Sequence, residues 1–255
     1  MMTASDIAHR FSSMDLDSEA TEYIAHNAGR YAWILELLGD LRKGRGDGPE
    51  TVLDVGPSFL TQLVQDRFPQ DTIYGLGLNH AASRGGHWPA ALTFPESHFI
   101  GFNLNDAQDK GKWIALPPVD LVIASEVLEH LYTAPTLVLN FLTSSLKPGG
   151  HALVSLPNAA TLLKRLALLR GKHPHEMIRE NADNPGHYRE YTADEMRRIA
   201  QRCSLEIVSM CTRNVNYAME LEKQRRLKGR ILCLMQDIAP ETMRGTHFLL
   251  ARKPR

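Results

Sequence analysis

The amino-acid sequence predicts an α/β protein with a doubly wound, mostly parallel sheet of seven strands and helices on both faces. Two observations predict it. Short apolar runs with the length of buried strands alternate with stretches in which apolar residues recur at helical spacing. The clearest run, residues 119–124, is apolar apart from Asp120, as in a parallel strand that is buried on both faces. Strands that alternate with helices along the chain favour parallel pairing through right-handed crossovers.

The stretch at residues 52–58 predicts the opening unit of this sheet. Val52, Leu53 and Val55 form a short buried strand around Asp54, and Gly56 starts a tight turn. A helix follows, in which the apolar residues at helical spacing are Leu60, Leu63, Val64 and Phe68. Ligands of such sheets bind at the carboxyl ends of the strands. Asp54, an acid at a strand tip, suits a ligand with hydroxyl or ammonium donors.

The other elements follow in chain order. A helix is predicted over about residues 19–38, and the polar residues 1–18 are expected to dock only loosely on the domain. Further strands are predicted at residues 71–76, 98–102, 119–124, 151–156, 205–210 and 246–251. Helices are predicted at residues 136–146, before a turn at residues 147–150, and after the capping box that begins at Thr192.

A single domain is expected over residues 1–255, and it has three additions to the sheet. The first is an N-terminal helical cap at about residues 1–45, which either covers the ligand site or packs on the sheet. The other two are inserted lobes at about residues 158–190 and 213–244, which are longer than ordinary connections. The second lobe is expected to have helical character around residues 218–234.

Composition bounds the function. The 255 residues are 43% hydrophobic and 23% charged, with a formal net charge of zero, which argues against a general nucleic-acid binder. The first ten residues have no signal-peptide pattern, and no apolar run approaches the length of a membrane span. The 3 cysteines form no CxxC pair. We therefore expect a soluble cytoplasmic protein with reduced thiols.

The order of these pieces resembles the class I methyltransferases that use S-adenosylmethionine, which have a Rossmann-like fold. The segments that carry the resemblance are residues 52–56, 119–131, 146–150, 157–158 and 187–192. Together the likeness covers roughly residues 50–210 and the last strand. It implies S-adenosylmethionine as cofactor, S-adenosylhomocysteine as product, and the branch of the family that acts on small molecules or glycans.

The resemblance also implies which residues bind the cofactor. Asp54 would hold its amino-acid end, and the turn of Gly56, Pro57 and Ser58 would let the backbone approach it. The segment after the third strand would lie by the adenine, and the residues after the fourth would line the methionine arm near the sulfonium. These residues are Asn103, Leu104, Ser125 and Glu126. Carboxylates and carbonyl oxygens hold a sulfonium cation well.

Two departures from the family pattern concern the cofactor. The family usually has further glycines where this chain has Ser58 and Leu60, so the approach to the turn is tighter. The acid expected at the tip of the second strand, which grips the ribose hydroxyls, is replaced by Gly77. Asn79 is the nearest polar residue that can substitute, and its neutral amide makes weaker hydrogen bonds than a carboxylate.

Two histidines are candidates for catalysis. Methyl transfer from a sulfonium is an in-line displacement that needs positioning above all, and an alcohol acceptor also benefits from a base. His130 lies in the motif after the fourth strand, and His187 ends the first inserted lobe. The structural alternatives are a hydrogen-bonding group at a helix start for His130 and docking of the lobe for His187. His173, His175 and Glu176 lack a convincing third ligand, so no metal is expected.

The favoured reaction is O-methylation of a small-molecule or sugar hydroxyl. The Asn-Pro-Pro-aromatic loop of amino-directed DNA methyltransferases is missing, and residues 156–158 occupy its place. The basic amphipathic helix at residues 162–170 either packs as a lid or touches an anionic membrane or a lipid-linked acceptor. The basic run at residues 223–228 is expected to be a solvated face and not a nucleic-acid site.

Two other classes of function compete with this one. Gly77 and Leu60 motivate a catalytically inactive binding or scaffold protein that kept the methyltransferase fold. A dinucleotide oxidoreductase is disfavoured because the first turn lacks the Gly-x-Gly-x-x-Gly pattern. The identity of the acceptor and the oligomeric state stay open at this point.

Overall fold

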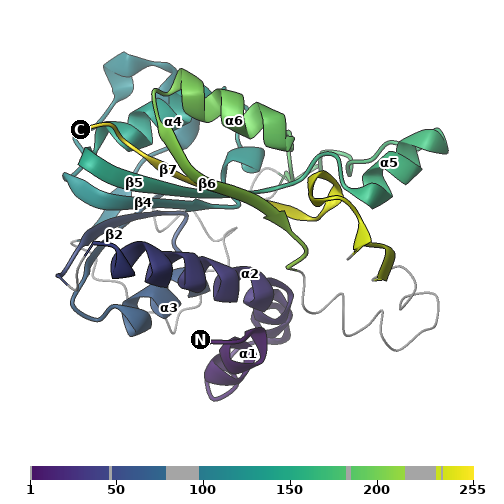
Figure 1. Ribbon diagram of the computed structural model, residues 1–255, viewed down its shortest axis with the longest axis horizontal. Coiled ribbons are helices and arrows are strands. Elements are labelled where there is room, and N and C mark those ends of the chain that lie inside the picture. The colour runs from purple at the N-terminus through teal and green to yellow at the C-terminus, as the bar shows by residue number, and fades with distance from the viewer. Residues whose placement is uncertain (1, 46–47, 79–97, 182–184, 216–233, 237) are drawn as a thin grey trace.

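A computed structural model of the protein describes residues 2–45, 48–78, 98–181, 185–215, 234–236 and 238–255. These residues form a seven-stranded sheet of order β3-β2-β1-β4-β5-β7-β6 (Figure 1). The strands are β1 (Thr51–Val55), β2 (Thr72–Gly77), β3 (Phe99–Gly101), β4 (Val119–Ser125), β5 (Leu146–Pro157), β6 (Glu206–Arg213) and β7 (Thr246–Arg252). The predicted α/β fold with a mostly parallel seven-stranded sheet is confirmed.

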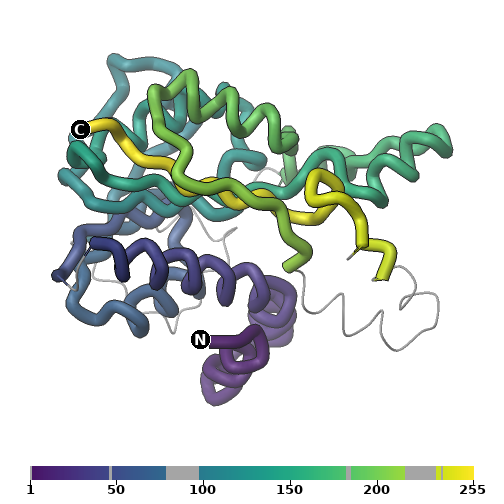
Figure 2. The backbone as a smooth tube through the Cα atoms, in the orientation of Figure 1, coloured from purple at the N-terminus to yellow at the C-terminus, as the bar shows by residue number. Residues whose placement is uncertain are grey.

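The sheet is parallel from β3 to β5 and antiparallel at its far edge. β1 pairs in parallel with β2 and β4, and these in turn pair in parallel with β3 and β5. β7 is antiparallel to both of its neighbours, β5 and β6. Figure 2 shows this last strand, drawn in yellow, running between the two others. The carboxyl ends of the five parallel strands therefore share one edge of the sheet.

Helices cover both faces of the sheet (Figure 1). One face is covered by α2 (Ser18–Lys43) and α3 (Phe59–Arg67), and the other by α4 (Pro135–Ser144) and α6 (Ala193–Arg202). The remaining two helices are α1 (Ala4–Phe11), which packs beside α2, and α5 (Leu162–Leu169), which projects away from the sheet. Among the described helices, none is both long enough and apolar enough to cross a membrane.

The core has two parts, one on each face, and the alternation of side chains along the strands assigns residues to them. Leu53 and Val55 of β1 lie in the cluster that includes α4 and α6. Val52 lies in the opposite cluster, with α2 and α3. Because successive strand residues point to opposite faces, Asp54 shares the face of Val52 and is directed toward α3. This position places an acid beneath the start of a helix.

The N-terminal segment differs from the expectation. Residues 1–18 were expected to dock loosely, and this is wrong for α1, which begins after a capping box formed by Thr3 and Asp6. Ile7 and Phe11 are buried, and the Phe11 ring centroid lies 5.0 Å from that of Phe59 in α3. The segment is held because two apolar side chains on one face of a short helix reach the core.

The start of β5 also differs. The turn predicted at residues 147–150 belongs to β5, which begins at Leu146, and its register with β4 shifts between Val119 and Leu121. Gly149 has φ +78°, and a Cβ built on Gly150 would lie 3.1 Å from the Asp120 carbonyl oxygen. Two glycines thus allow an irregular strand where a turn was expected. The helical character expected at residues 218–234 lies almost entirely outside the described residues.

A close contact between α2 and the chain after β6 predicts a destabilising substitution. A Cβ built on Gly29 would lie 2.3 Å from the carbonyl oxygen of Val215. We expect Gly29→Ala to lower the free energy of unfolding by about 1–3 kcal/mol, because the backbones must separate. Urea denaturation measures this change. In the same helix, a Cβ on Gly39 meets nothing within 4 Å, so Gly39→Ala is the control and should be neutral or stabilising. Equal effects at the two positions would contradict the contact.

Candidate active site

The first group of candidate residues lies where β1 ends. Gly56 has φ +70°, a conformation that favours glycine, and its N–H donates to the Leu76 carbonyl oxygen at 2.8 Å. Ser58 caps α3, and its hydroxyl accepts a hydrogen bond from Leu60 N–H. The turn between β1 and α3 is therefore fixed at both ends. It gathers Asp54, Gly56, Pro57 and Ser58 at one strand tip.

Asp54 is an unusual acid because it is buried. Its relative exposure is 3%, and its Oδ2 accepts a hydrogen bond from the Thr61 hydroxyl at 2.5 Å. Burial raises the pKa of Asp54 to about 7, and the hydrogen bond from Thr61 only partly opposes this shift. The carboxyl is thus poised between its two protonation states near neutral pH. A cationic or hydrogen-bonding ligand would draw it to the carboxylate form.

The second group lies where β4 ends, beside the first. Because Val55 pairs with Ala124, the residues after β4 emerge next to the β1 turn. Glu126 has φ 56°, a conformation that costs a non-glycine residue about 1–3 kcal/mol and is typical of functional sites. Its Oε2 forms an ion pair with Arg30 Nη1 at 3.1 Å, and its Oε1 accepts from the Ser155 hydroxyl at 3.3 Å. The Ser125 and Ser155 hydroxyl oxygens are 2.9 Å apart.

Arg30 was not among the residues predicted from sequence. It comes from α2, is 8% exposed, and reaches the end of β4 from the helical cap. Although burial lowers the pKa of its guanidinium, the carboxylate of Glu126 raises it further, and the net shift is upward. The cap therefore both packs on the sheet and supplies a permanent cation to the site. The sequence offered one signal for Arg30: it is a charged residue directly before Tyr31, which lies on the apolar face of the helix predicted over about residues 19–38.

The remaining cofactor candidates lie farther along the sheet or outside the described residues. Leu104 is buried and Asn103 is exposed, at the start of a short turn of helix after β3. Asn105 connects this turn to the loop after β4, because its Oδ1 accepts from the N–H groups of Tyr132 at 3.0 Å and Thr133 at 3.2 Å. Asn79 lies outside the described residues.

The two candidate histidines meet above Glu129. The ring centroids of His130 and His187 are 4.8 Å apart, and His130 Nε2 lies 3.9 Å from Glu129 Oε1. The lobe is attached here by the backbone, since Tyr188 N–H donates to the Glu129 carbonyl oxygen at 2.8 Å. Burial lowers the pKa of both imidazoles, that of His187 to about 4, with the neighbouring His130 adding to the effect. Both rings are neutral at pH 7.

Each of these histidines has one ring nitrogen held by an oxygen acceptor. His130 Nδ1 lies 3.0 Å from the Gly186 carbonyl oxygen, and His187 Nδ1 lies 3.1 Å from Glu190 Oε1. A carbonyl or carboxylate oxygen accepts but never donates, so each Nδ1 carries the proton. The lone pair of each neutral imidazole is therefore on Nε2.

Sequence reasoning assigned no role to Glu129, Glu190 or Lys164. Glu190 forms an ion pair with Lys164, and its Oε2 lies 3.5 Å from His175 Nδ1. Burial lowers the pKa of Lys164 to about 8. Glu129 lies in residues 119–131, one of the segments that carry the family resemblance. Its place three residues after Glu126 was the only sequence signal for a role of this acid. Of the residues from which no metal was expected, His175 therefore reaches the same glutamate as His187, and His173 contacts the His175 ring, with the ring centroids 5.7 Å apart.

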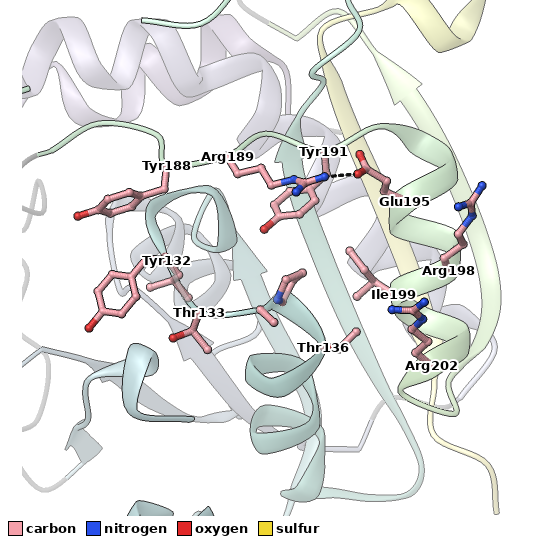
Figure 3. Close-up of a pocket in the computed structure, with 13 residues that line it drawn as sticks. Tyr132, Thr133, Thr136, Tyr188, Arg189, Tyr191, Glu195, Arg198, Ile199 and Arg202 are labelled. Carbon is pink, nitrogen blue, oxygen red and sulfur yellow. Dashed lines mark hydrogen bonds and ion pairs between the residues drawn. The ribbon is translucent and has the colours of Figure 1, made fainter. Parts of the chain in front are cut away.

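A cavity of about 610 Å³ is lined by Leu131 and Tyr188, the chain neighbours of His130 and His187, but by neither histidine (Figure 3). It lies between the loop after β4 and α6, and its lining comes from residues 131–136, 188, 189, 191, 195, 198, 199 and 202. Tyr132 and Tyr188 lie at one end with their ring centroids 5.9 Å apart, and Arg198 and Arg202 lie at the other.

A sheet of this strand order, with acids at the tips of β1 and β4, is the architecture of the class I methyltransferases. The family model described as a methyltransferase domain matches residues 23–210. The chain belongs to this family, the class I S-adenosylmethionine-dependent methyltransferases. It is a methyltransferase, and its cofactor is S-adenosylmethionine.

Solved structures share the fold at low sequence identity. A protein from Bacillus halodurans C-125 assigned as a methyltransferase superposes with a TM-score of 0.53 at 16% identity, over 87% of this chain and 99% of that one. One from Listeria monocytogenes assigned as an S-adenosylmethionine-dependent methyltransferase gives 0.54 at 14%, over 89% and 99%. Magnesium protoporphyrin IX methyltransferase from Synechocystis PCC 6803, with bound S-adenosylhomocysteine, gives 0.54 at 13%, over 98% and 94%. Among curated proteins, none matches this chain.

Proposed function

We propose that this enzyme transfers a methyl group to a hydroxyl of a small molecule or sugar. The observation that supports this reaction best is the pair of neutral imidazoles, His130 and His187, in segments whose next residues, Leu131 and Tyr188, line a cavity. A neutral imidazole with a free lone pair accepts a hydrogen bond from a hydroxyl and holds its oxygen in line for attack.

The residues at the strand tips fit S-adenosylmethionine, which supplies its methyl group from a sulfonium centre. Asp54 suits the ammonium group, and Gly56, with no side chain and φ +70°, lets the backbone approach the ligand. Glu126 suits the sulfonium. Arg30 Nε is buried and has no hydrogen-bond partner among the described residues, so the guanidinium keeps a donor for the ligand's carboxylate.

His187 is proposed as the residue that contacts the acceptor hydroxyl. Glu190 orients its ring through Nδ1, so that Nε2 can accept the hydroxyl hydrogen. With a pKa of about 4 it is a weak base near pH 7, and its contribution is mainly to orient and polarise the oxygen. The ring of His130 is oriented by the Gly186 carbonyl oxygen and contacts the ring of His187.

The cavity suggests the character of the acceptor. Tyr132 and Tyr188 offer aromatic surface for a ring, and Arg202 of α6 offers a cation for an anionic group, beside Arg198, which forms an ion pair with Asp194. Among the described helices, α5 is unusual in burying none of its residues, and Leu168 and Leu169 are 57% and 83% exposed beside basic residues. This surface supports the further proposal that a lipid-linked acceptor reaches the site from an anionic membrane.

A labelled-methyl assay tests the proposed reaction. The protein is incubated with S-adenosylmethionine carrying a tritiated methyl group and with paired acceptors that differ only in a hydroxyl or an amine. We expect label on sugar or phenolic hydroxyls. Label on the amines alone would contradict O-methylation. S-adenosylhomocysteine binding without transfer to any acceptor in a broad panel would favour the inactive scaffold.

At the tip of β2, replacing Gly77 is expected to strengthen cofactor binding, whereas most substitutions in a binding site weaken it. A Cβ built on Gly77 has only ordinary contacts, with Phe99 at 3.7 Å and Pro57 at 3.9 Å, so an acidic side chain has room. We expect Gly77→Asp to tighten S-adenosylhomocysteine binding about 10-fold, because a carboxylate can accept from the ribose hydroxyls. Calorimetric titration measures it, with Gly77→Asn as the uncharged control. Weaker binding by the acidic variant would place the ribose elsewhere.

A further inference from the structure

Glu129 is a buried acid, and the side chain nearest to its carboxylate is that of His130, with Nε2 3.9 Å from Oε1. Its relative exposure is 0%, and among the described residues neither carboxylate oxygen has a hydrogen-bond partner. Burial, reinforced by the nearby Glu126, raises the pKa of Glu129 well above its ordinary value. A buried polar group without a partner costs about 1–3 kcal/mol, and more when it is charged. Either a proton or a bound cation must compensate it.

The two imidazoles above Glu129 have the arrangement of metal-ligating histidines. In such sites one ring nitrogen donates to a carbonyl or carboxylate oxygen, and the other binds the metal. Here His130 Nδ1 faces the Gly186 carbonyl and His187 Nδ1 faces the Glu190 carboxylate, and neither Nε2 makes a hydrogen bond to another described residue.

We propose that Glu129, His130 and His187 bind a divalent transition cation such as Zn²⁺, Mn²⁺ or Co²⁺. Their potential ligand atoms all lie within 4.8 Å of one another. Ligands about 2.0–2.2 Å from one ion are at most roughly 4.4 Å apart, so a small side-chain adjustment closes the site. One carboxylate and two imidazoles suit a borderline transition ion and leave coordination positions for water or another oxygen ligand.

Charges of both signs surround the cluster. Arg30, Lys164 and Arg179 act on its side chains as cations, and Glu126 and Glu176 act as anions. The feature that favours a cation is Glu129 itself, whose carboxylate oxygens are buried and have no hydrogen-bond partner among the described residues. Binding of the cation does not depend on the proposed methyl transfer. With the cation bound, His187 Nε2 is a ligand and no longer a hydrogen-bond acceptor, so the cation would take over the contact with the acceptor oxygen. Only this use of the cation rests on the proposed function.

Calorimetric titration of the full chain tests the site. The protein is stripped with a chelator, the chelator is removed, and Zn²⁺, Mn²⁺ and Co²⁺ are titrated separately. We expect one ion to bind per chain, with affinity at least about 10-fold lower in Glu129→Gln and in His187→Gln. His173→Gln, which changes a histidine of the same lobe outside the cluster, should bind like the wild type.

Two outcomes of the metal titrations overturn the proposal. If none of the three ions binds to the wild type, or if Glu129→Gln binds them as well as the wild type, Glu129 is compensated by a proton. S-adenosylhomocysteine is titrated into the same preparations. Normal binding of it shows that a variant is folded, and its failure in the wild type would count against the proposed function and not against the cation site.

Discussion

Asp54→Asn is expected to weaken S-adenosylhomocysteine binding about 10–100-fold, and at the same time to stabilise the free protein. Binding weakens because the neutral amide cannot offer a charged acceptor to an ammonium group, which costs about 1–3 kcal/mol. The fold tolerates the change, since asparagine has the same shape and its oxygen can still accept from Thr61. Calorimetric titration near pH 8 measures the loss. Unchanged affinity would mean that the cofactor does not use this strand tip.

The stabilisation follows from the raised pKa of Asp54. In the folded state the pKa is about 7 against an ordinary value of 3.8, so the folded protein binds more protons between these values. The carboxyl therefore favours folding at low pH, and this contribution is lost as pH rises from about 4 to 7. The full penalty above pH 7 is about 4 kcal/mol as an upper limit.

Removing the ionisable group removes this penalty. We expect Asp54→Asn to raise the free energy of unfolding by about 2–4 kcal/mol at pH 8 and by about 1–2 kcal/mol at pH 5. Urea denaturation at the two pH values measures both. A destabilising effect, or a gain larger at pH 5 than at pH 8, would contradict the burial of a charged carboxylate at this position.

The second large effect is expected at His187. His187→Ala should lower turnover about 100-fold and leave the affinity for S-adenosylhomocysteine within about 2-fold of the wild type. The side chain contacts the lobe, His130 and Glu190, and it has no contact with the β1 turn among the described residues. Steady-state kinetics with an accepted hydroxyl substrate, paired with calorimetry, separates the two quantities.

The control for this prediction is His173→Ala, since His173 is an exposed histidine of the same lobe. It should leave both quantities near their wild-type values. Equal losses of turnover and of cofactor affinity in His187→Ala would show that the histidine supports the fold of the pocket and has no separate role toward the acceptor.

Local pattern predicted much of the fold and one half of the site. β1, β4 and the turn at Gly56 were predictable because each depends on residues next to each other in the chain. Asp54 was a candidate because it is an acid at a strand tip, and Glu126 was a candidate through the family resemblance. Their proximity follows from the parallel pairing of β1 with β4.

The other half of the site depends on contacts between distant parts of the chain. His130 meets the end of the lobe at Gly186, 56 residues later, and no local pattern encodes that approach. Arg30 reaches Glu126 only because α2 packs across the sheet. Glu129 is a candidate because its carboxyl group is buried, and a sequence motif does not show burial. Contacts of this kind form the side of the site that we propose for the acceptor, and local sequence patterns do not predict them.

The central claim is that the cofactor lies across the tips of β1 and β4, between Asp54 and Glu126. A crystal structure with S-adenosylhomocysteine tests it most directly. We expect density for the amino-acid end of the ligand beside Asp54, with its sulfur near Glu126. Density for the adenosyl group at another place, with the crevice at these tips filled by side chains, would contradict the account.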